Sequence, residues 1–173
     1  MSTLQIGQLK CHEETDEAGS DDIYFVVGIG RRSISPKKAE VKVITSSNWL
    51  DLESGDPLRT RDVTIDPAFN TQDFYTITMV ERDNRNDLVG TNLKVVKDTF
   101  ASLWQTWGVN VNGLNDNQIF DHMRYDLNRV IGGAGNDELV GSTRLLNKPS
   151  PGKNTDMVFK GDGGKYRVWF KVV

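Results

Sequence analysis

Hydrophobic and polar residues alternate at both ends of the chain, the pattern of β-strands with one buried face. In residues 165–173 the apolar members share one face of the strand: Tyr166, Val168, Phe170 and Val172. The opposite face carries Arg167, Trp169 and Lys171. Weaker alternation predicts strands at residues 3–11, 39–45, 61–65, 73–81, 143–146 and 156–160. Residues 23–29 are apolar without interruption, so we expect a strand buried on both faces.

Between residues 92 and 131 the hydrophobic period changes from that of a strand to that of a helix. Two amphipathic helices are predicted, at residues 93–107 and 116–130, with Asn115 capping the second. The apolar stripe of the first helix consists of Leu93, Val96, Phe100, Leu103 and Trp107. This phase places Trp107 in the core and Trp104 at the surface. The expected fold is mainly β, an antiparallel β-sandwich with a two-helix insertion at about residues 92–131.

Composition agrees with one folded domain over residues 1–173. The chain has 37% hydrophobic and 26% charged residues, as globular proteins do. Its 24 acidic and 21 basic residues nearly balance, so we expect no nucleic-acid partner. No basic, apolar leader begins the chain, and no window approaches the ~20 apolar residues of a membrane span. The expectation is a cytoplasmic protein or one exported by a leaderless route.

Catalytic motifs are weak. The single cysteine, Cys11, excludes an internal disulfide framework and a multi-cysteine zinc site. The chain has two histidines and no Gly-x-Ser-x-Gly elbow, so we expect no enzyme. Gly28-Ile29-Gly30 lacks the third glycine and the helix of a nucleotide loop. The basic cluster that follows is expected to lie in a solvated turn: Arg31, Arg32, Lys37 and Lys38.

Three acidic loops are the strongest chemical signal. They occupy residues 12–22, 81–87 and 132–138, each at a predicted strand boundary, and the last two share an Asn-Asp pair followed by Leu-Val-Gly and a hydroxyl residue. Calcium takes roughly six to eight oxygen ligands from such loops. The candidate ligands are Asp16, Asp21, Asp22, Glu81, Asp83, Asp87, Asp137 and Glu138. The alternative is that these are solvated turns, which favour the same residue types.

Two families share parts of this pattern. The stretch Gly132-Gly133-Ala134-Gly135-Asn136-Asp137-Glu138-Leu139-Val140 resembles the calcium-binding nonapeptide of RTX toxins, although only one copy is present. Val80-Glu81-Arg82-Asp83 and the strand opening at residues 136–141 resemble the two sides of a calcium loop in C2 domains. In that resemblance Asp21 and Asp22 correspond to first-loop acids. It implies a β-sandwich that binds Ca²⁺ at one end and contacts a membrane surface.

The leading hypothesis is therefore a non-catalytic, calcium-binding β-sandwich module, acting on a membrane or partner or as a toxin-like accessory protein. The alternative is a metal-independent carbohydrate- or protein-binding module that uses Trp49 and Trp104 as ligand contacts. Bound calcium between the acidic loops would separate the two.

Overall fold

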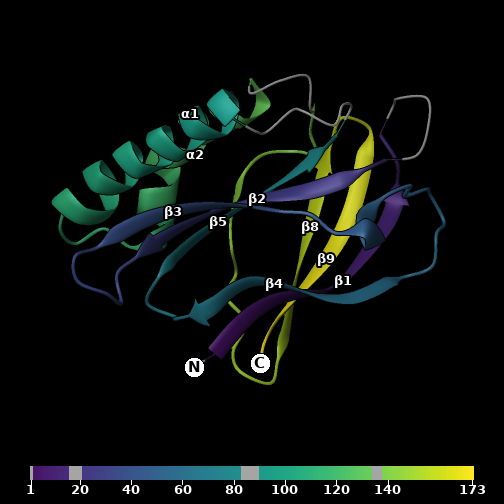
Figure 1. Cartoon of the computed structure of the whole chain (residues 1–173), viewed down its shortest axis with the longest axis horizontal. Coiled ribbons are helices and arrows are strands. Elements are labelled where there is room, and N and C mark those ends of the chain that lie inside the picture. Colours follow the sequence, from purple (N-terminus) through teal and green to yellow (C-terminus); the bar gives the residue numbers. More distant parts are fainter. Residues whose placement is uncertain (1, 16–20, 83–89, 134–137) are drawn as a thin grey trace.

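The chain is mainly β, as the sequence predicts (Figure 1). The computed structural model describes residues 2–15, 21–82, 90–133 and 138–173. Its strands are β1 (Ser2–Glu13), β2 (Ile23–Arg31), β3 (Lys38–Ile44), β4 (Arg59–Phe69), β5 (Phe74–Glu81), β6 (Glu138–Leu139), β7 (Arg144–Leu145), β8 (Asn154–Gly161) and β9 (Gly164–Val172). Its helices are η1 (Ser47–Trp49), α1 (Gly90–Leu103), the π-helical η2 (Trp104–Asn110) and α2 (Asp116–Gly132).

Two antiparallel sheets pack face to face. Within the described part of the chain, the first has the order β4-β1-β9-β8, and the second has the order β3-β2-β5-β6 with β7 also paired to β5. Apolar side chains from both sheets form the core between them, including Leu4, Phe25, Ile77, Val168 and Phe170. The apolar face predicted for residues 165–173 is confirmed, because its members in β9 are buried.

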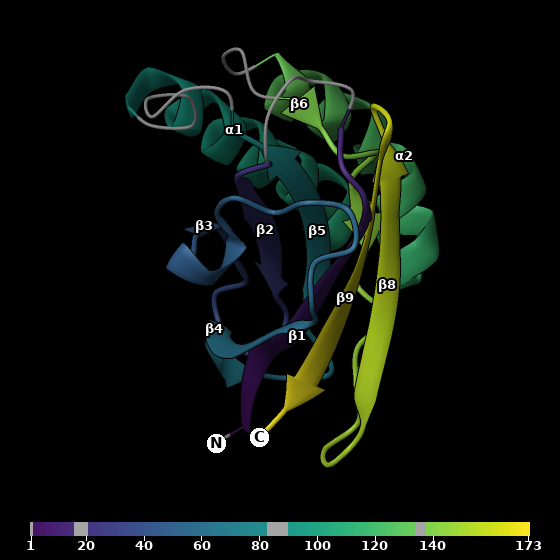
Figure 2. The same ribbon diagram turned by 90° about the vertical axis from the view of Figure 1, so that its right-hand side faces the viewer.

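The helices cover the outer face of the second sheet, so the molecule has three layers (Figures 1 and 2). This explains why every residue of β2 is buried, as predicted from its uninterrupted apolar run. Phe25 and Val27 face the core between the sheets, whereas Tyr24 and Val26 face the helices. The helices leave the outer face of the first sheet uncovered.

The helical insertion begins and ends at neighbouring strands. α1 follows β5 and α2 precedes β6, and these strands pair with Val80 opposite Leu139. Asn115 caps α2 as predicted: its side chain accepts from the Gln118 N–H, and the Gln118 side chain accepts from the Asn115 N–H. Among the described residues, no helix is long and apolar enough to cross a membrane.

The predicted exposure of Trp104 is wrong. Trp104 is 1% exposed and stacks on Phe74 with ring centroids 5.5 Å apart, whereas Trp107 is half-buried. Two glycines leave the space for this indole: a Cβ atom would lie 2.5 Å from it at Gly30 and 2.2 Å from it at Gly108. The phase of the apolar stripe cannot reveal this, because Gly30 and Phe74 come from strands that are distant from Trp104 in the sequence.

Candidate functional site

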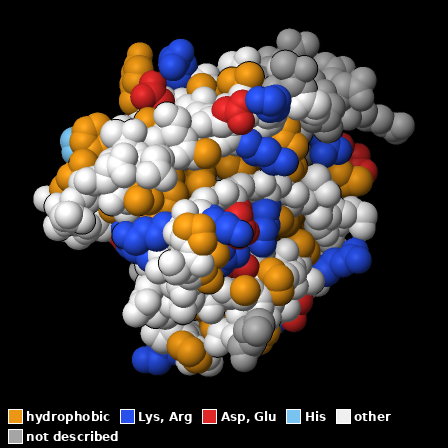
Figure 3. All heavy atoms as spheres, turned by 60° about the vertical axis from the view of Figure 1, so that its left-hand side comes forward, with side chains coloured by type: hydrophobic (Ala, Val, Ile, Leu, Met, Phe, Trp, Pro, Cys, Tyr) orange, Lys and Arg blue, Asp and Glu red, His pale blue; other side chains and the backbone are white. Residues whose placement is uncertain are grey.

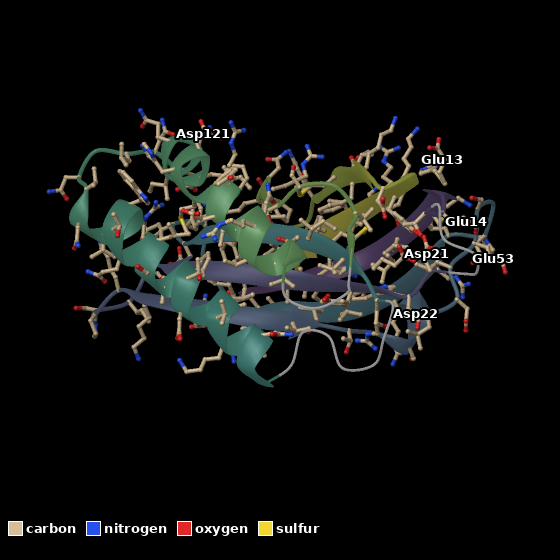
Figure 4. The ribbon with its side chains drawn as sticks, turned by 90° about the horizontal axis from the view of Figure 1, so that it is seen from above. Glu13, Glu14, Asp21, Asp22, Glu53 and Asp121 are labelled. Carbon is tan, nitrogen blue, oxygen red and sulfur yellow. The ribbon has the colours of Figure 1, made fainter. Side chains whose placement is uncertain are left out.

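The described ends of the three acidic segments lie at one end of the second sheet. In the β2-β5-β6 ladder Glu81 is opposite both Ile23 and Glu138, and the Arg82 N–H donates to the Asp22 carbonyl at 2.8 Å. Figure 4 shows Glu13, Glu14, Asp21, Asp22 and Glu53 at this end, with Asp121 far away on α2. Asp16, Asp83, Asp87 and Asp137 lie outside the described residues, as does the side chain of Glu138.

Asp21 has structural hydrogen bonds rather than an open coordination site. It is 1% exposed, and its carboxylate accepts from the Thr15 N–H and hydroxyl, both at 2.9 Å, and from the Tyr166 hydroxyl. The Asp22 carboxylate accepts from the Asp51 N–H at 3.0 Å. In the part of the chain that the structure describes, no three His, Cys, Asp or Glu side chains are grouped to hold a metal ion.

Both tryptophans predicted as ligand contacts are buried. Trp49 is 1% exposed and packs edge-on against Phe25 in the core, with ring centroids 5.1 Å apart. Trp104 lies between α1 and the second sheet, with the Arg32 guanidinium 5.2 Å from its ring centroid. Burial removes both ring faces from the surface, so neither indole is available to a ligand in this conformation.

A half-buried tryptophan, Trp169, lies on the uncovered face of the first sheet. Beside it is a hollow of about 90 Å³, called here the Gly7 hollow. The lining residues come from all four strands of that sheet: Gly7, Gln8, Thr60, Asp62, Asn154, Trp169 and Lys171. The hollow thus combines one aromatic ring with amide, hydroxyl, carboxylate and ammonium groups.

A β-bulge and a missing side chain form this hollow. Ile6 pairs with Phe170 and Gln8 with Trp169, so Gly7 is the extra residue of β1 opposite β9. Gly7 has no Cβ atom to fill the space over the strand. The nearest atom to a Cβ added there would be in the Lys171 side chain, at 3.5 Å.

The charges on this face are paired across the strands. Lys171 contacts Asp62 at 2.7 Å, and Arg167 contacts Asp156 at 2.8 Å. The Arg167 guanidinium also lies 5.0 Å from the Trp169 ring centroid, which holds the indole in place. Alternation along residues 165–173 had already assigned Arg167, Trp169 and Lys171 to the face opposite the core. What it could not supply was the neighbouring strands that complete the hollow.

A buried ionic network, centred on Arg31, lies at the other end of the second sheet. Arg31 pairs with Asp66 through both terminal nitrogens, at 2.6 and 2.8 Å, and its Nη1 lies 3.1 Å from Asp73. Glu40 accepts two more hydrogen bonds from the guanidinium, at 3.0 and 3.1 Å. The expected solvated turn is therefore wrong for Arg31, which is 6% exposed because β3, β4 and the residue before β5 bring these acids around it.

The pKa values of this network follow from its hydrogen bonds. Burial alone would raise the pKa of Asp66, but hydrogen bonds from Arg31 and Tyr75 outweigh it and lower the pKa to about 2. Hydrogen bonding to Asp66 raises the pKa of Arg31, and burial raises the pKa of the Tyr75 hydroxyl. Asp66, Arg31 and Tyr75 therefore hold their charge state across the physiological range, which indicates a structural role rather than proton transfer.

The network continues to the surface through a fourth acid, Asp116. Asp116 pairs with Arg32 at 2.5 Å and with Lys148 at 2.9 Å. Burial would raise the pKa of Asp116, but these two cations lower it. Figure 3 looks onto this end of the molecule, where Lys and Arg side chains gather around acidic ones below the helices. The pairing ties α2 to the turn after β2.

Comparison with protein-family models, with curated proteins and with solved structures finds no match for this chain. The coarser part of the C2 resemblance, two antiparallel sheets packed as a β-sandwich-like fold, is confirmed. Membership of the C2 or RTX families receives no support.

Proposed function

We propose that this chain is a non-catalytic carbohydrate-binding module that holds a neutral saccharide in the Gly7 hollow. The supporting observation is the half-buried Trp169 beside the polar side chains that line the Gly7 hollow. Binding sites for small molecules typically pair an apolar wall with a few placed polar groups. A sugar ring has the matching chemistry, because its C–H faces are apolar and its hydroxyl groups both donate and accept hydrogen bonds.

The polar lining favours a ligand with many hydroxyl groups. Gln8 and Asn154 each offer an amide donor and an amide acceptor, and Thr60 offers a hydroxyl that can do both. Asp62 accepts and Lys171 donates. Sugar hydroxyl groups donate and accept hydrogen bonds at the same time, so this mixture of donors and acceptors suits them.

Charge pairing favours a neutral ligand over an anionic one. The Lys171 and Arg167 cations are each compensated by a carboxylate within 2.8 Å. An anionic saccharide would have to displace Asp62 or Asp156 to use them. Asp62 is also the one carboxylate among the residues that line the hollow, whereas glycoside hydrolysis commonly uses two. The charge pairing therefore favours a neutral ligand, and the single carboxylate in the lining favours binding without catalysis.

Trp169→Ala should weaken saccharide binding by about tenfold or more, because aromatic anchors contribute most to such interfaces. The ligand would first be identified on a glycan array run in the presence of a chelator. Its dissociation constant would then be measured by titration calorimetry for the native protein and the variant.

Two further variants sharpen this test. Trp107→Ala removes a half-buried indole that stacks on His122 on the helices, so it should leave binding unchanged. Gly7→Ala adds a methyl group to the floor of the hollow at ordinary contact distances, so it should fold normally and weaken binding. The proposal fails if no neutral glycan binds, or if Trp107→Ala and Trp169→Ala have equal effects.

A second candidate function is calcium binding at the end of the sandwich where β2 begins. The observation that favours it is the β2-β5-β6 ladder, which brings Ile23, Glu81 and Glu138 side by side and so gathers three acidic segments. Clustered carboxylates repel one another until a cation neutralises them. In this proposal Ca²⁺ stabilises the loops rather than taking part in a reaction.

Calcium should therefore raise the thermal unfolding midpoint, and a chelator should lower it again. A ligand at 100 times its dissociation constant stabilises by about 2.7 kcal/mol, which corresponds to a shift of roughly 5 °C or more for a chain of this length. Differential scanning calorimetry would measure the shift, with magnesium as the control ion. Asp83→Asn and Asp137→Asn should abolish it, and an unchanged midpoint in the native protein would exclude the calcium proposal.

A further inference from the structure

A second pocket, independent of the Gly7 hollow, opens where β2 begins. Its volume is about 180 Å³, which is several times the roughly 30 Å³ that one water molecule occupies in the liquid. It is lined by residues from the start of β2, the segment after β3 and the residue after β5: Asp22, Ile23, Thr45, Ser46, Ser47, Leu50 and Arg82. We call it the Arg82 pocket.

Two serine hydroxyl groups of this pocket each accept one hydrogen bond from the protein. The Ser46 Oγ accepts from the Asn48 N–H at 3.2 Å, and the Ser47 Oγ accepts from the Arg61 guanidinium at 3.0 Å. A hydroxyl group has one hydrogen to donate. Each serine can therefore donate its hydrogen to an acceptor in the pocket.

Two guanidinium groups add to this donor character. Arg82 lines the pocket and lies over the Tyr24 ring, 5.5 Å from its centroid, which restrains its side chain. Arg61 reaches the rim through its bond to Ser47. The opposing carboxylate is Asp22, whose Oδ1 accepts from the Asp51 N–H. Arg82 and Asp22 are the charged residues that line the pocket, and Arg61 adds a cation at its rim.

We infer that the Arg82 pocket binds a tetrahedral oxyanion, specifically the phosphate group of a monoester. Such a group has several acceptor oxygens and negative charge, which match Arg82 and the two serine hydroxyls. Planar guanidinium groups bind phosphate oxygens in pairs, and serine hydroxyls add single hydrogen bonds. The side chains, rather than the backbone of the short η1 turn, provide the recognition. The same chemistry serves a free phosphate and the phosphate of a lipid headgroup.

Titration of the whole chain with inorganic phosphate tests the first source, by calorimetry in a phosphate-free and sulfate-free buffer. Sedimentation with phosphatidylcholine vesicles, with and without phosphatidic acid, tests the second. Arg82→Gln should weaken binding by about tenfold or more, since it removes a charge-assisted donor pair. Ser47→Ala should weaken phosphate binding less. Arg82→Lys should have an intermediate effect, because lysine keeps the positive charge but lacks the paired N–H donors of the guanidinium group.

Arg124→Gln is the matched control, since it removes the same charge from the exposed surface of α2, where Arg124 contacts Asp121 at 3.6 Å. Saturable phosphate binding that is lost in Arg82→Gln and kept in Arg124→Gln supports the inference with a free ligand. Binding confined to phosphatidic acid vesicles, with the same dependence on Arg82, supports it with a membrane source. The inference is overturned if neither probe binds the native protein, or if the two arginine variants bind equally.

Discussion

Arg31→Met should lower the free energy of unfolding by about 3–5 kcal/mol, because it breaks a buried ion-pair network from one side. Asp66 and Asp73 are 0% exposed and both pair with this guanidinium. Without it, Lys42 still lies 3.5 Å from Asp66, but its side chain is 30% exposed. Domains are typically stable by only about 5–15 kcal/mol, so the loss would be large. Urea unfolding followed by circular dichroism would measure it.

The next residue supplies the control. Arg32 pairs with Asp116, but both side chains are about a quarter exposed, at 24% and 25%. Arg32→Met removes the same chemical group from a partly solvated pair, so it should cost about 1 kcal/mol. Equal losses in the two variants would contradict a buried, mutually dependent network around Arg31.

The pH dependence gives a second readout of the same network. The pKa of Asp66 is lowered from 3.8 to about 2 in the folded protein. A carboxyl group whose pKa is lower in the folded protein stabilises the fold at pH values above its pKa in the unfolded chain. For Asp66 this contribution is about 2 kcal/mol, and it is lost as the pH falls through the pKa of the folded protein. The native protein should therefore lose stability between about pH 4 and pH 2. The difference between native and Arg31→Met should shrink over that range, because protonated carboxyl groups no longer need the cation.

Gly28→Ala should lower the free energy of unfolding by about 2–3 kcal/mol through overpacking. Gly28 lies in β2 beneath α1, and an added Cβ would meet the Phe100 ring at 2.3 Å and the Thr76 hydroxyl at 2.5 Å. The second sheet and α1 would have to separate, or Phe100 would have to leave its position. Thermal and urea unfolding would both report the change.

Gly7→Ala is the matched substitution in the other sheet. Its nearest neighbour atom lies at 3.5 Å, an ordinary contact, so its stability should change by less than about 1 kcal/mol. Phe100→Leu removes the ring that Gly28→Ala would strike, so the two changes together should cost less than their sum. Strict additivity would show that the ring contact is not the cause.

Calcium and phosphate make opposite demands on the end of the sandwich where Asp22 and Arg82 lie. A cation would favour the carboxylates of the acidic segments, whereas an oxyanion would favour Arg82 and the serine hydroxyls. Asp22 is common to both, because it belongs to the predicted calcium set and also lines the Arg82 pocket. Measuring phosphate binding with and without calcium would show whether the two ligands compete or cooperate.

Much of the fold follows from periodicity alone. The apolar run of β2, the alternation in β9 and the cap at Asn115 were each predicted correctly, because burial and capping act on consecutive residues. β4 spans Arg59–Phe69, beyond the predicted residues 61–65, and it includes Pro67. The structure places β4 at the edge of its sheet, where a proline is tolerated.

The candidate sites, in contrast, depend on contacts between residues that are distant in the sequence. Trp104 was predicted to be exposed and Arg31 to be solvated, and both are buried by segments that are distant in the sequence. Trp169 was assigned to the correct face, yet its partners Gly7, Asp62 and Asn154 come from three other strands. Nothing in local sequence specifies which strands are neighbours, so the composition of a hollow across four strands cannot be read from any one of them.

By itself, the sequence determined the mainly β class, the position of the two-helix insertion and the inward faces of the principal strands. These properties depend on residues two apart, which share one face of a strand, and on residues three or four apart, which share one face of a helix. Only the tertiary structure decided which side chains are buried in pairs and which polar groups surround Trp169 and Arg82. Those relations depend on strand order and register, which arise from the packing of both sheets and the helices together.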